Sequence, residues 1–366
     1  MNCNIKVIIA GGGTGGHLFP AITIGQNLEK LGANVKYMGS KFGIESEYFK
    51  VNDIKAILLT IEGLQRSISI SSLKKNFLFP LRFFFSYMVA RSFIKEFRPD
   101  IVVGTGGYSS GLPLLAAIHL NRKTLIQEQN SYPGLTTRKL ASKVNLVCTG
   151  FESANKYLKT NTVFTGNPVR SDILIIDTKI AKNLFGLNQN QSVITILGGS
   201  QGSVPLNNHF KNNYKKYTNN NIQILWQCGK LNYEELKNKI NDPQVHIFPF
   251  FDNIGEVYSA SDIIISRAGA LALSEMALFK KAMILIPLPH AAQNHQTLNA
   301  EKFVKLGAAK LVKQSELNSG KLEKIIIELF NGNNNDLKSM IKNTEMIRKP
   351  NAIKEIIHKI FEVANS

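Results

Sequence analysis

Residues Asp262 to Asn299 read DIIISRAGALALSEMALFKKAMILIPLPHAAQNHQTLN. The stretch opens with the apolar run Ile263 to Ile265, which is typical of a buried parallel strand, and a small-residue turn leads into a helical segment from Ala270 to Phe279. A second buried strand is expected from Met283 to Ile286. This order places the first N–H groups of the helix at the carboxyl end of a sheet, where an anion such as a diphosphate is held.

Polar side chains accompany this turn. Glu275 lies in the expected helix, and the cluster Gln293-Asn294-His295-Gln296 follows the second strand. A diphosphate pocket flanked by a carboxylate and several amides resembles a nucleotide-sugar site more than a site for a nucleotide alone. The alternative is an ordinary strand–helix–strand unit in which Glu275 lies on a solvated helix face.

Length and composition indicate a two-domain α/β protein with anionic partners. The chain has 366 residues, and its hydrophobic fraction of 44% allows sizeable cores. Cys3, Cys148 and Cys228 are scattered, which fits a reducing cytosol and predicts neither a disulfide framework nor a metal site. No signal peptide is expected, because residues 1–6 lead directly into a strand. The net charge of +18 favours anionic partners, but no nucleic-acid motif accompanies it, so no nucleic acid is expected as a partner.

The amino-terminal end predicts a second glycine-looped unit. A strand, a loop, a helix and a strand are expected at residues 5–10, 11–17, 21–31 and 35–38. The loop also matches the dinucleotide fingerprint G-x-G-x-x-G, which requires an acidic residue at the end of the second strand. Gly39 and Ser40 occupy that position, and the nearest acid is Glu45. A nicotinamide-dependent oxidoreductase therefore stands only as an alternative.

A segment rich in phenylalanine and basic residues follows. Residues 71–95 read SSLKKNFLFPLRFFFSYMVARSFIK, and a helix starting near Pro80 would place Leu81, Phe84, Phe85 and Met88 on one face. Charged residues within the run exclude a membrane span of about 20 residues. The mixture of apolar and basic side chains instead predicts contact with a membrane surface, through Lys74, Lys75, Arg82, Phe84 and Phe85. The alternative is a helix buried on two sides.

The glycine-looped pattern recurs after about half the chain. A strand at 193–197 precedes the loop at 198–203 and a helix from about residue 206, and the segment 163–170 is read as the crossing between domains. We expect an amino-terminal domain at residues 1–165, a carboxyl-terminal domain at 166–349 and a final helix at about 350–366 that packs back on the first domain. Two such α/β halves facing one another form a cleft, a common place for small-molecule sites.

Seven motifs, in one order along the chain, resemble those of glycosyltransferase family 28. They are GGTGGH at 12–17, GGY at 106–108, EQN at 128–130, GNPVR at 166–170, GGSQG at 198–202, SRAGALALSE at 266–275 and HQTLNAE at 295–301. The resemblance implies the GT-B fold, with two Rossmann-like domains whose parallel sheets face a central cleft. It also implies transfer of N-acetylglucosamine from UDP-N-acetylglucosamine to the muramyl 4-hydroxyl of lipid I, undecaprenyl-diphosphoryl-N-acetylmuramyl-pentapeptide, with inversion. The product would be lipid II, a peptidoglycan precursor, made by a peripheral enzyme on the cytoplasmic face of the bacterial inner membrane.

The resemblance assigns most sugar-donor contacts to the second half of the chain. Fixed hydrogen-bond donors would stabilise the charge that develops on leaving UDP. Glu275 would accept bonds from the ribose hydroxyls, and the backbone at Phe251 would meet uracil. The implied sugar-donor residues are Thr14, Gly15, Gly16, Asn130, Arg170, Ser200, Phe251, Ala270, Leu271, Ala272, Leu273, Ser274, Glu275 and Gln296. The sequence contains no D-x-D pair, so neither a metal nor another cofactor is expected.

The acceptor hydroxyl needs a base, and the sequence offers two. His17 is expected near a helix N-terminus, where the helix dipole disfavours imidazolium and a neutral ring can take the proton. Glu128 is the competing base, or the group that orients one. The loop residues Gly13 to Gly15 would let N–H groups approach the acceptor diphosphate. The implied acceptor residues are Gly13, Gly106, Gly107 and Tyr108.

Two departures from the family pattern concern the same regions. Gln127 stands before the EQN triplet where many members carry His, and the segment before His295 reads AAQN instead of a more acidic version.

Two further alternatives for the function also stay open. One is a transferase of the same fold that acts on a different lipid or a small acceptor. The other is a catalytically silent scaffold that binds nucleotide sugars at the membrane.

Overall fold

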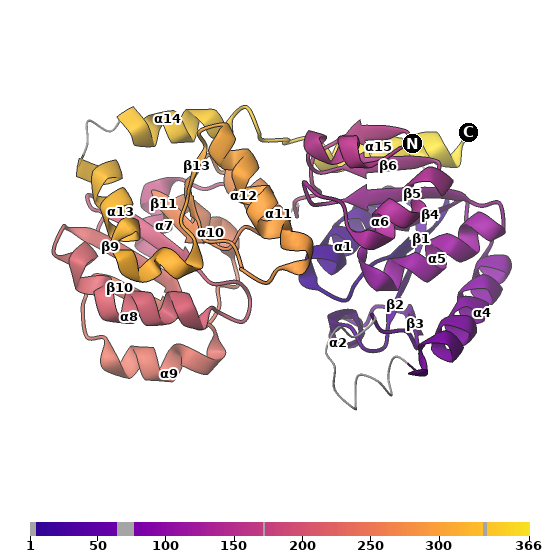
Figure 1. Cartoon of the computed structure of the whole chain (residues 1–366), viewed down its shortest axis with the longest axis horizontal. Coiled ribbons are helices and arrows are strands. Elements are labelled where there is room, and N and C mark those ends of the chain that lie inside the picture. Colours follow the sequence, from indigo (N-terminus) through magenta and orange to yellow (C-terminus); the bar gives the residue numbers. More distant parts are fainter. Residues whose placement is uncertain (1–4, 64–76, 171–172, 332–334) are drawn as a thin grey trace. The chain divides into compact units, whose positions relative to one another are not determined.

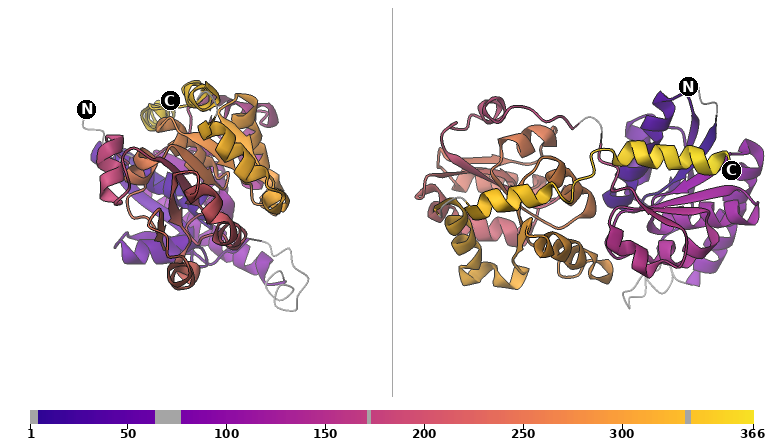
Figure 2. Two further views of the ribbon diagram at one scale, coloured as in Figure 1. Left: turned by 90° about the vertical axis from the view of Figure 1, so that its left-hand side faces the viewer. Right: turned by 90° about the horizontal axis from the view of Figure 1, so that it is seen from above.

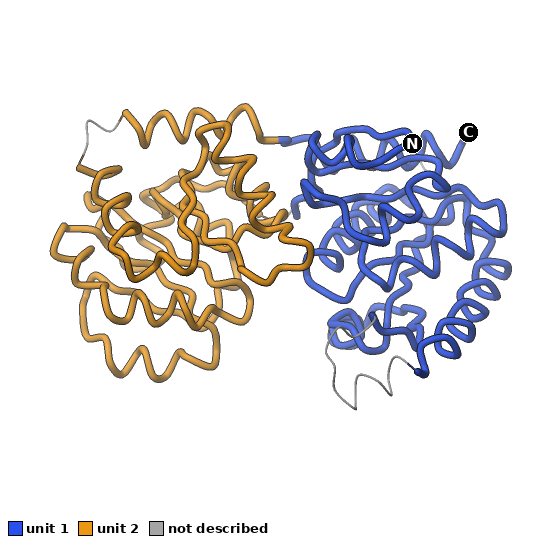
Figure 3. The backbone as a smooth tube through the Cα atoms, in the orientation of Figure 1, with its two compact units in different colours: residues 1–170, 349–366 blue, residues 171–348 orange. Residues whose placement is uncertain are grey.

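The computed structural model describes residues 5–63, 77–170, 173–331 and 335–366. They divide into two compact units, unit 1 (Met1–Arg170 and Lys349–Ser366) and unit 2 (Ser171–Arg348), shown in Figure 3. The boundary expected from the sequence is residue 165, and the first part of unit 1 extends five residues further, to Arg170. The crossing segment belongs to unit 1 because the Asn167 side chain is buried there, where it accepts a hydrogen bond from Gln127 and donates one to the Gln129 carbonyl.

Unit 1 is built on a seven-stranded sheet within the described residues, and every strand pairing in it is parallel. Its strand order is β3-β2-β1-β4-β5-β6-β7. The central strands are apolar along their length because both faces of a parallel sheet are covered. In the register of β1, Ile9 lies between Tyr37 and Val103. The strands are β1 (Lys6–Ala10), β2 (Asn34–Ser40), β3 (Ala56–Leu59), β4 (Ile101–Gly104), β5 (Lys123–Glu128), β6 (Leu146–Thr149) and β7 (Thr162–Phe164).

Helices cover both faces of this sheet (Figures 1 and 2). Alternate residues of β1 point to opposite faces, so Val7 and Ile9 pack with α1 and the carboxyl-terminal α15, whereas Ile8 and Ala10 pack with α4 and α5. The helices are α1 (Gly15–Lys30), α2 (Ile44–Val51), α4 (Phe79–Phe97), α5 (Gly107–His119), α6 (Leu135–Leu140) and α15 (Ala352–Ala364), with 3₁₀ turns η1 (Ala141–Lys143) and η2 (Glu152–Tyr157).

Unit 2 repeats the architecture with a six-stranded parallel sheet among the described residues, in the order β10-β9-β8-β11-β12-β13. Its strands are β8 (Ser192–Leu197), β9 (Ile222–Gln227), β10 (Val245–Phe248), β11 (Ile263–Ser266), β12 (Ala282–Leu285) and β13 (Ala309–Leu311). Its helices are α7 (Thr178–Leu184), α8 (Val204–Thr218), α9 (Lys230–Lys239), α10 (Ile254–Ala260), α11 (Ala270–Leu278), α12 (His295–Lys305), α13 (Lys321–Asn331) and α14 (Asn335–Thr344), with 3₁₀ turns η3 (Ala292–Asn294) and η4 (Gln314–Ser319). Helices α8, α9, α13 and α14 contribute to the core on one face of the sheet.

The strand order reverses direction once in each sheet. In unit 1 the chain moves from β1 to β2 and β3 on one side, and then to β4 on the other side of β1. In unit 2 the corresponding reversal lies between β8 and β11. Ligands of open α/β sheets bind at such switch points, outside the carboxyl ends of the strands. The loops after β1, β4, β8 and β11 are therefore the places to look for a site.

Helix α4 is not buried on two sides, contrary to the alternative expectation. Ser86, Ala90 and Ile94 are its buried residues. The predicted apolar face is exposed instead, with exposed fractions of 58% for Leu81, 57% for Phe84, 63% for Phe85 and 46% for Met88. In the described part of the chain, α4 and the other helices are all too short or too polar to span a membrane. The predicted membrane residues Lys74 and Lys75 lie outside the described residues.

Candidate active site

His17 lies at the switch point of unit 1, in the first turn of α1. This helix begins at Gly15, six residues before the expected start at residue 21, so the end of the glycine motif is helical. The His17 Nδ1 atom is 3.0 Å from the Thr105 carbonyl oxygen and 2.9 Å from Gln129 Oε1. A carbonyl oxygen only accepts hydrogen bonds, so Nδ1 carries the hydrogen and Nε2 of the neutral ring keeps its lone pair.

Two of the predicted acceptor residues, Gly106 and Gly107, lie against the same ring. A Cβ atom on Gly106 would lie 2.8 Å from His17 Nδ1, and one on Gly107 would lie 2.6 Å from the Gly12 carbonyl oxygen. Both glycines also have positive φ, 92° and 76°, which a side chain would strain. The Tyr108 ring lies against Gly13, where an added Cβ would be 2.8 Å from Tyr108 Cε1. Burial raises the pKa of Tyr108, so its hydroxyl stays protonated and can donate.

Glu45 was not predicted as a site residue, yet its buried carboxylate holds the glycine-rich loop. It accepts hydrogen bonds from the Gly13 N–H at 2.7 Å and the Ser40 N–H at 2.8 Å. A Cβ atom on Gly12 would overlap this carboxylate. The Gly13 N–H, predicted to approach the acceptor diphosphate, is thus bound to a carboxylate inside the loop. The same contacts keep Glu45 from binding the ribose of a dinucleotide.

We expect Glu45→Gln to lower the free energy of unfolding by about 2 kcal/mol, because hydrogen bonds to a charged group contribute about 1.5–3 kcal/mol each. The amide would keep one acceptor oxygen but would direct its NH₂ group at one of the two backbone donors. Urea denaturation followed by circular dichroism measures the loss. Glu47→Gln is the matched control, since Glu47 shares the first turn of α2 but is exposed. Equal stability of the two variants would contradict the role given to Glu45.

Glu128, the competing base, is 1% exposed and its carboxylate is occupied by its own loop. Oε1 accepts from the Asn130 N–H at 3.0 Å and from the Asn130 side chain at 3.3 Å. Oε2 accepts from the Gly134 N–H at 3.1 Å and from the Thr137 hydroxyl at 2.5 Å. These four hydrogen bonds hold the loop after β5 in place. Two of them come from Asn130 and fix its position.

Arg267 organises the switch point of unit 2, a role that the sequence did not reveal. Its guanidinium donates to the Ile286 carbonyl at 3.0 Å, to Ser203 Oγ at 2.7 Å and to Gln314 Oε1 at 2.8 Å. It thereby ties the loops after β8, β11 and β12 together. Burial lowers the pKa of Arg267 from its usual value, but a guanidinium stays charged in proteins. All these acceptors are neutral, so the loops carry a positive charge at the place where a diphosphate is expected.

The loop after β8 and the predicted uracil segment are joined by Gln227, which was not predicted either. Its Nε2 donates to the Gly199 carbonyl at 2.9 Å, and its Oε1 accepts from the Phe251 N–H at 3.1 Å. The Phe251 side chain is buried against Phe185 and Phe248. Ser200 is exposed in the loop. A uracil contact at Phe251 would thus have to use a group other than this N–H.

Helix α11 places the predicted sugar-donor residues in different environments. Glu275 is half-buried, and its Oε2 accepts a hydrogen bond from the Tyr258 hydroxyl at 2.9 Å. Ser274 Oγ donates to the Ala270 carbonyl of the same helix at 3.0 Å. Leu273 is fully buried and its N–H donates to the Gly269 carbonyl at 3.0 Å. Leu271 and Ala272, in the first turn, remain half-buried.

Gln296 is the second residue of α12, after the 3₁₀ turn η3. Its Oε1 accepts from the Leu288 N–H at 2.9 Å, which leaves the amide nitrogen of the side chain as its donor group. Gln293 and Asn294, just before it, have positive φ of 55° and 56°. Two adjacent left-handed residues other than glycine are uncommon and often occur at functional sites.

The predicted sugar-donor residues divide between the units. Thr14, Gly15, Gly16, Asn130 and Arg170 belong to unit 1, and the residues from Ser200 to Gln296 belong to unit 2.

Within the described residues, no group of three or more His, Cys, Asp or Glu side chains is placed to hold a metal ion.

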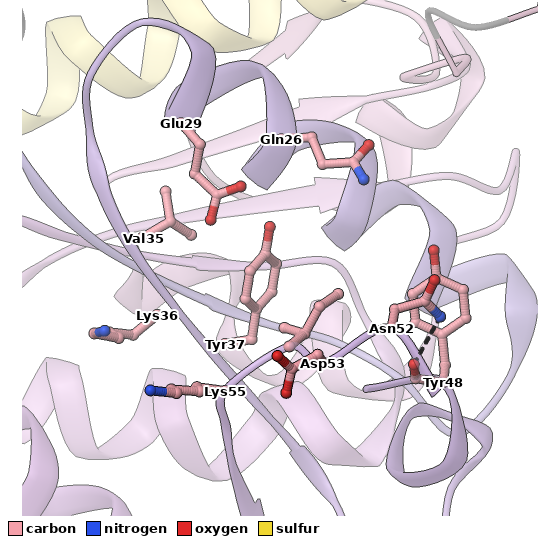
Figure 4. A pocket seen from close by; sticks show the side chains of 10 residues that line it. Gln26, Glu29, Val35, Lys36, Tyr37, Tyr48, Asn52, Asp53 and Lys55 are labelled. Atoms are coloured by element: carbon pink, nitrogen blue, oxygen red, sulfur yellow. Dashed lines mark hydrogen bonds between the residues drawn. The ribbon is translucent and has the colours of Figure 1, made fainter. Parts of the chain in front are cut away.

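A pocket of about 410 Å³ lies elsewhere in unit 1 (Figure 4). It is lined by residues at the end of α1, at the start of β2 and in the turn before β3, including Glu29, Tyr37 and Asp53. These residues lie where β2 and β3 begin, whereas the predicted site lies where strands end. The pocket contains none of the predicted site residues.

Both units resemble glycosyltransferases of the GT-B class. A crystal structure of MurG from Acinetobacter baumannii superimposes with a TM-score of 0.79 at 27% identity, covering 98% of this chain and 99% of that one. The calicheamicin glycosyltransferase CalG4 gives a TM-score of 0.68 at 12% identity, which shows the fold alone. The fold class expected from the sequence is thus confirmed.

The family follows from the sequence comparisons. Residues 7–149 match the glycosyltransferase family 28 N-terminal domain, and residues 193–358 match the family 28 C-terminal domain. The chain belongs to glycosyltransferase family 28.

Two relatives carry one name, UDP-N-acetylglucosamine–N-acetylmuramyl-(pentapeptide) pyrophosphoryl-undecaprenol N-acetylglucosamine transferase. The relative from Flavobacterium psychrophilum is 38% identical, with 99% of this chain and 98% of the relative covered. The relative from Desulforamulus reducens is 36% identical, with 96% and 97% covered.

Proposed function

We infer that this chain transfers N-acetylglucosamine from UDP-N-acetylglucosamine to the muramyl 4-hydroxyl of lipid I, with inversion, and so makes lipid II for peptidoglycan. The observation that carries this inference is that the family's motifs occupy both switch points, with His17 at one and α11 at the other. The named relatives, similar over nearly the whole chain, support the same activity.

Unit 1 supplies the base in this proposal. The His17 Nε2 lone pair takes the proton of the acceptor hydroxyl as its oxygen attacks the anomeric carbon. Glu128 is the poorer candidate because four hydrogen-bond donors hold its carboxylate within its own loop. The Tyr108 hydroxyl, which also hydrogen-bonds with Ser40, and the N–H groups of Gly15 and Gly16 are then the candidate groups for binding the acceptor, since the Gly13 N–H is bound to Glu45 and the His17 N–H to the Thr14 carbonyl.

Unit 2 supplies the sugar-donor site. We propose that the first turn of α11, the loop at Ser200 and the charge of Arg267 stabilise the diphosphate as UDP leaves. The family resemblance also assigns Arg170, the last residue of this part of unit 1, to the binding of the diphosphate. Glu275, held by Tyr258, accepts bonds from the ribose hydroxyls. These cationic and N–H groups support a mechanism that needs no divalent metal.

Exposed apolar side chains favour a lipid acceptor over a small aglycone. Phe19 and Ile44, which are 36% and 46% exposed, flank Gly15 in the glycine-rich loop. Phe42, 49% exposed, stacks with Arg82 of α4 at 5.4 Å from its ring centre. We propose that a polyprenyl chain contacts these exposed side chains, which lie beside the predicted diphosphate region and beside α4.

We propose that the α4 apolar surface, defined as Leu81, Phe84, Phe85, Met88 and Val89, contacts an anionic membrane on the cytoplasmic face of the inner membrane. All five side chains are exposed. Arg91 and Lys95 on the same helix add positive charge. Arg82 is bound to Glu62 at 2.7 Å, so its charge is offset and contributes less than the sequence suggested.

Replacing Phe84 and Phe85 together by Ser is expected to lower binding to phosphatidylglycerol vesicles at least about tenfold, because burial of a phenylalanine side chain is worth about 1.5–3 kcal/mol when complete. Vesicle sedimentation measures the bound fraction. Leu231→Ser is the matched control, since Leu231 of unit 2 is 94% exposed. Unchanged vesicle binding by the double variant would contradict the membrane role of α4.

The acceptor is tested by offering alternatives to the same enzyme and labelled donor. A lipid I analogue with a short polyprenyl chain should accept the sugar, and the water-soluble muramyl peptide without the lipid diphosphate should accept it poorly. Equal or better transfer to a small aglycone would favour the second candidate, a related transferase with a different acceptor.

A further inference from the structure

A chain of buried amide side chains ends on the ring of His17. Gln129 Oε1 lies 2.9 Å from His17 Nδ1, and Gln129 Nε2 lies 2.5 Å from Gln127 Oε1. Gln127 Nε2 in turn donates to Asn167 Oδ1 at 3.2 Å. Gln127, Gln129 and Asn167 are at most 2% exposed, so water does not compete for these contacts.

The surroundings of Gln129 fix which way its amide points. Its Nε2 is 2.8 Å from the Thr105 carbonyl oxygen and 2.9 Å from the Gln127 carbonyl oxygen. Both are obligate acceptors, so this position must hold the NH₂ group and the other must hold the oxygen. The oxygen therefore faces His17 Nδ1, which can approach it only as a donor.

Asn167 fixes the far end of the chain. Its Nδ2 donates to the Gln129 carbonyl at 3.1 Å, which leaves its Oδ1 as the acceptor for Gln127 Nε2. The orientation of each amide is thus determined by the next, from the crossing segment to the glycine-rich loop. A buried network of this kind selects one arrangement, because reversing one amide would place two hydrogen-bond donors or two acceptors against each other.

We propose that Gln129 is a positioning residue that holds His17 in the Nδ1–H tautomer, with the Nε2 lone pair presented to the acceptor hydroxyl. This proposal rests on the proposed role of His17 as the base. A neutral amide selects the tautomer without adding a negative charge, whereas a carboxylate at the same place would also stabilise imidazolium. Gln129 therefore sets the ring for proton acceptance without placing a negative charge beside it.

The first test is the ¹⁵N spectrum of the histidine rings in the full-length protein without substrate, with His17→Gln used to identify the His17 signals. The native protein should show the Nδ1–H tautomer. Gln129→Met should increase the other tautomer, since only the Thr105 carbonyl then holds Nδ1. An Nε2–H tautomer in the native protein, or an unchanged spectrum in Gln129→Met, would overturn the proposal.

The second test is the pH dependence of sugar transfer. Gln129→Met should lower kcat about tenfold with little change in KM for the nucleotide sugar. Gln129→Glu should recover activity relative to Gln129→Met at pH values where its buried carboxyl is protonated, because the acid, like the amide, then donates to the Thr105 or Gln127 carbonyl and accepts from Nδ1. The other titratable groups around the loop, Glu45, Tyr108 and Glu128, are the same in both variants.

A control separates positioning from general damage to the fold. Gln223 in unit 2 is also buried, at 3% exposure, and its amide is bound on both sides by the Asn188 backbone. Gln223→Glu should lower the melting temperature without moving the pH profile. If Gln129→Met keeps the native kcat, or Gln129→Glu recovers no activity over Gln129→Met at any pH, the positioning role is rejected. The predicted tautomer in a protein that transfers no sugar would reject the proposed function alone.

Discussion

Replacing His17 by Ala is expected to lower kcat for sugar transfer by about 10²- to 10⁴-fold, the usual contribution of a positioned general base. The acceptor hydroxyl is a weak nucleophile while it keeps its proton, and Nε2 is the ring atom left to take that proton once Nδ1 is bound to Thr105 and Gln129. Binding of UDP-N-acetylglucosamine should change little. Steady-state kinetics with saturating lipid I analogue, together with calorimetric titration of the sugar donor, measures both quantities.

The comparison with Glu128 decides between the two bases. Glu128→Gln should reduce stability, because an amide cannot accept all four hydrogen bonds that the carboxylate accepts. A folded Glu128→Gln protein should nevertheless keep the acidic limb of the pH profile. If that limb disappears in Glu128→Gln and persists in His17→Gln, the assignment of the base is reversed. Unchanged transfer by His17→Ala would instead favour the catalytically silent alternative.

Replacing Glu275 by Gln is expected to raise the dissociation constant of UDP about 10- to 100-fold. Hydrogen bonds to a charged group contribute about 1.5–3 kcal/mol, and the ribose hydroxyls would lose their charged acceptor. Tyr258→Phe is the matched comparison, since it keeps the carboxylate but removes the hydroxyl that holds Oε2. Its effect should be several-fold, in the same direction. Calorimetric titration with UDP measures both variants.

The outcome for Glu275 also tests its location. Unchanged UDP affinity in Glu275→Gln would place the ribose away from α11 and would contradict the sugar-donor site in unit 2. A loss of affinity for UDP-N-acetylglucosamine without a loss for UDP would move Glu275 from the ribose to the sugar.

The fold was predictable because its signals are local. Parallel strands such as Ile263–Ser266 are apolar on both faces, and a glycine-rich turn into a helix marks each switch point. The exact start of α1 was not predictable in this way, because glycine has little helical preference and yet Gly15 and Gly16 are helical. The exposed face of α4 was recognised as excess apolar surface, but only the structure distinguishes exposure from burial on a second side.

The motifs of the site were predictable from the sequence, but the hydrogen bonds between its residues were not. Glu45 and Gly13 are 32 residues apart, and Arg267 and Ser203 are 64 apart, so their pairing depends on the sheet topology. Gln129 was quoted only as part of the EQN motif, because an amide carries no charge or periodicity that marks it as a partner of His17. Leu273 lies in a motif of the family, yet its side chain serves the core.

The most direct test of the account is transfer of labelled N-acetylglucosamine from UDP-N-acetylglucosamine to a short-chain lipid I analogue by the purified full-length protein, with EDTA present. The account predicts incorporation into a disaccharide with a β-(1→4) linkage, identified by NMR. Donor binding without incorporation would contradict the proposed activity, and an α-linked product would contradict inversion. A strict requirement for added divalent metal would contradict the role given to the α11 N-terminus, Arg170 and Arg267 at the diphosphate.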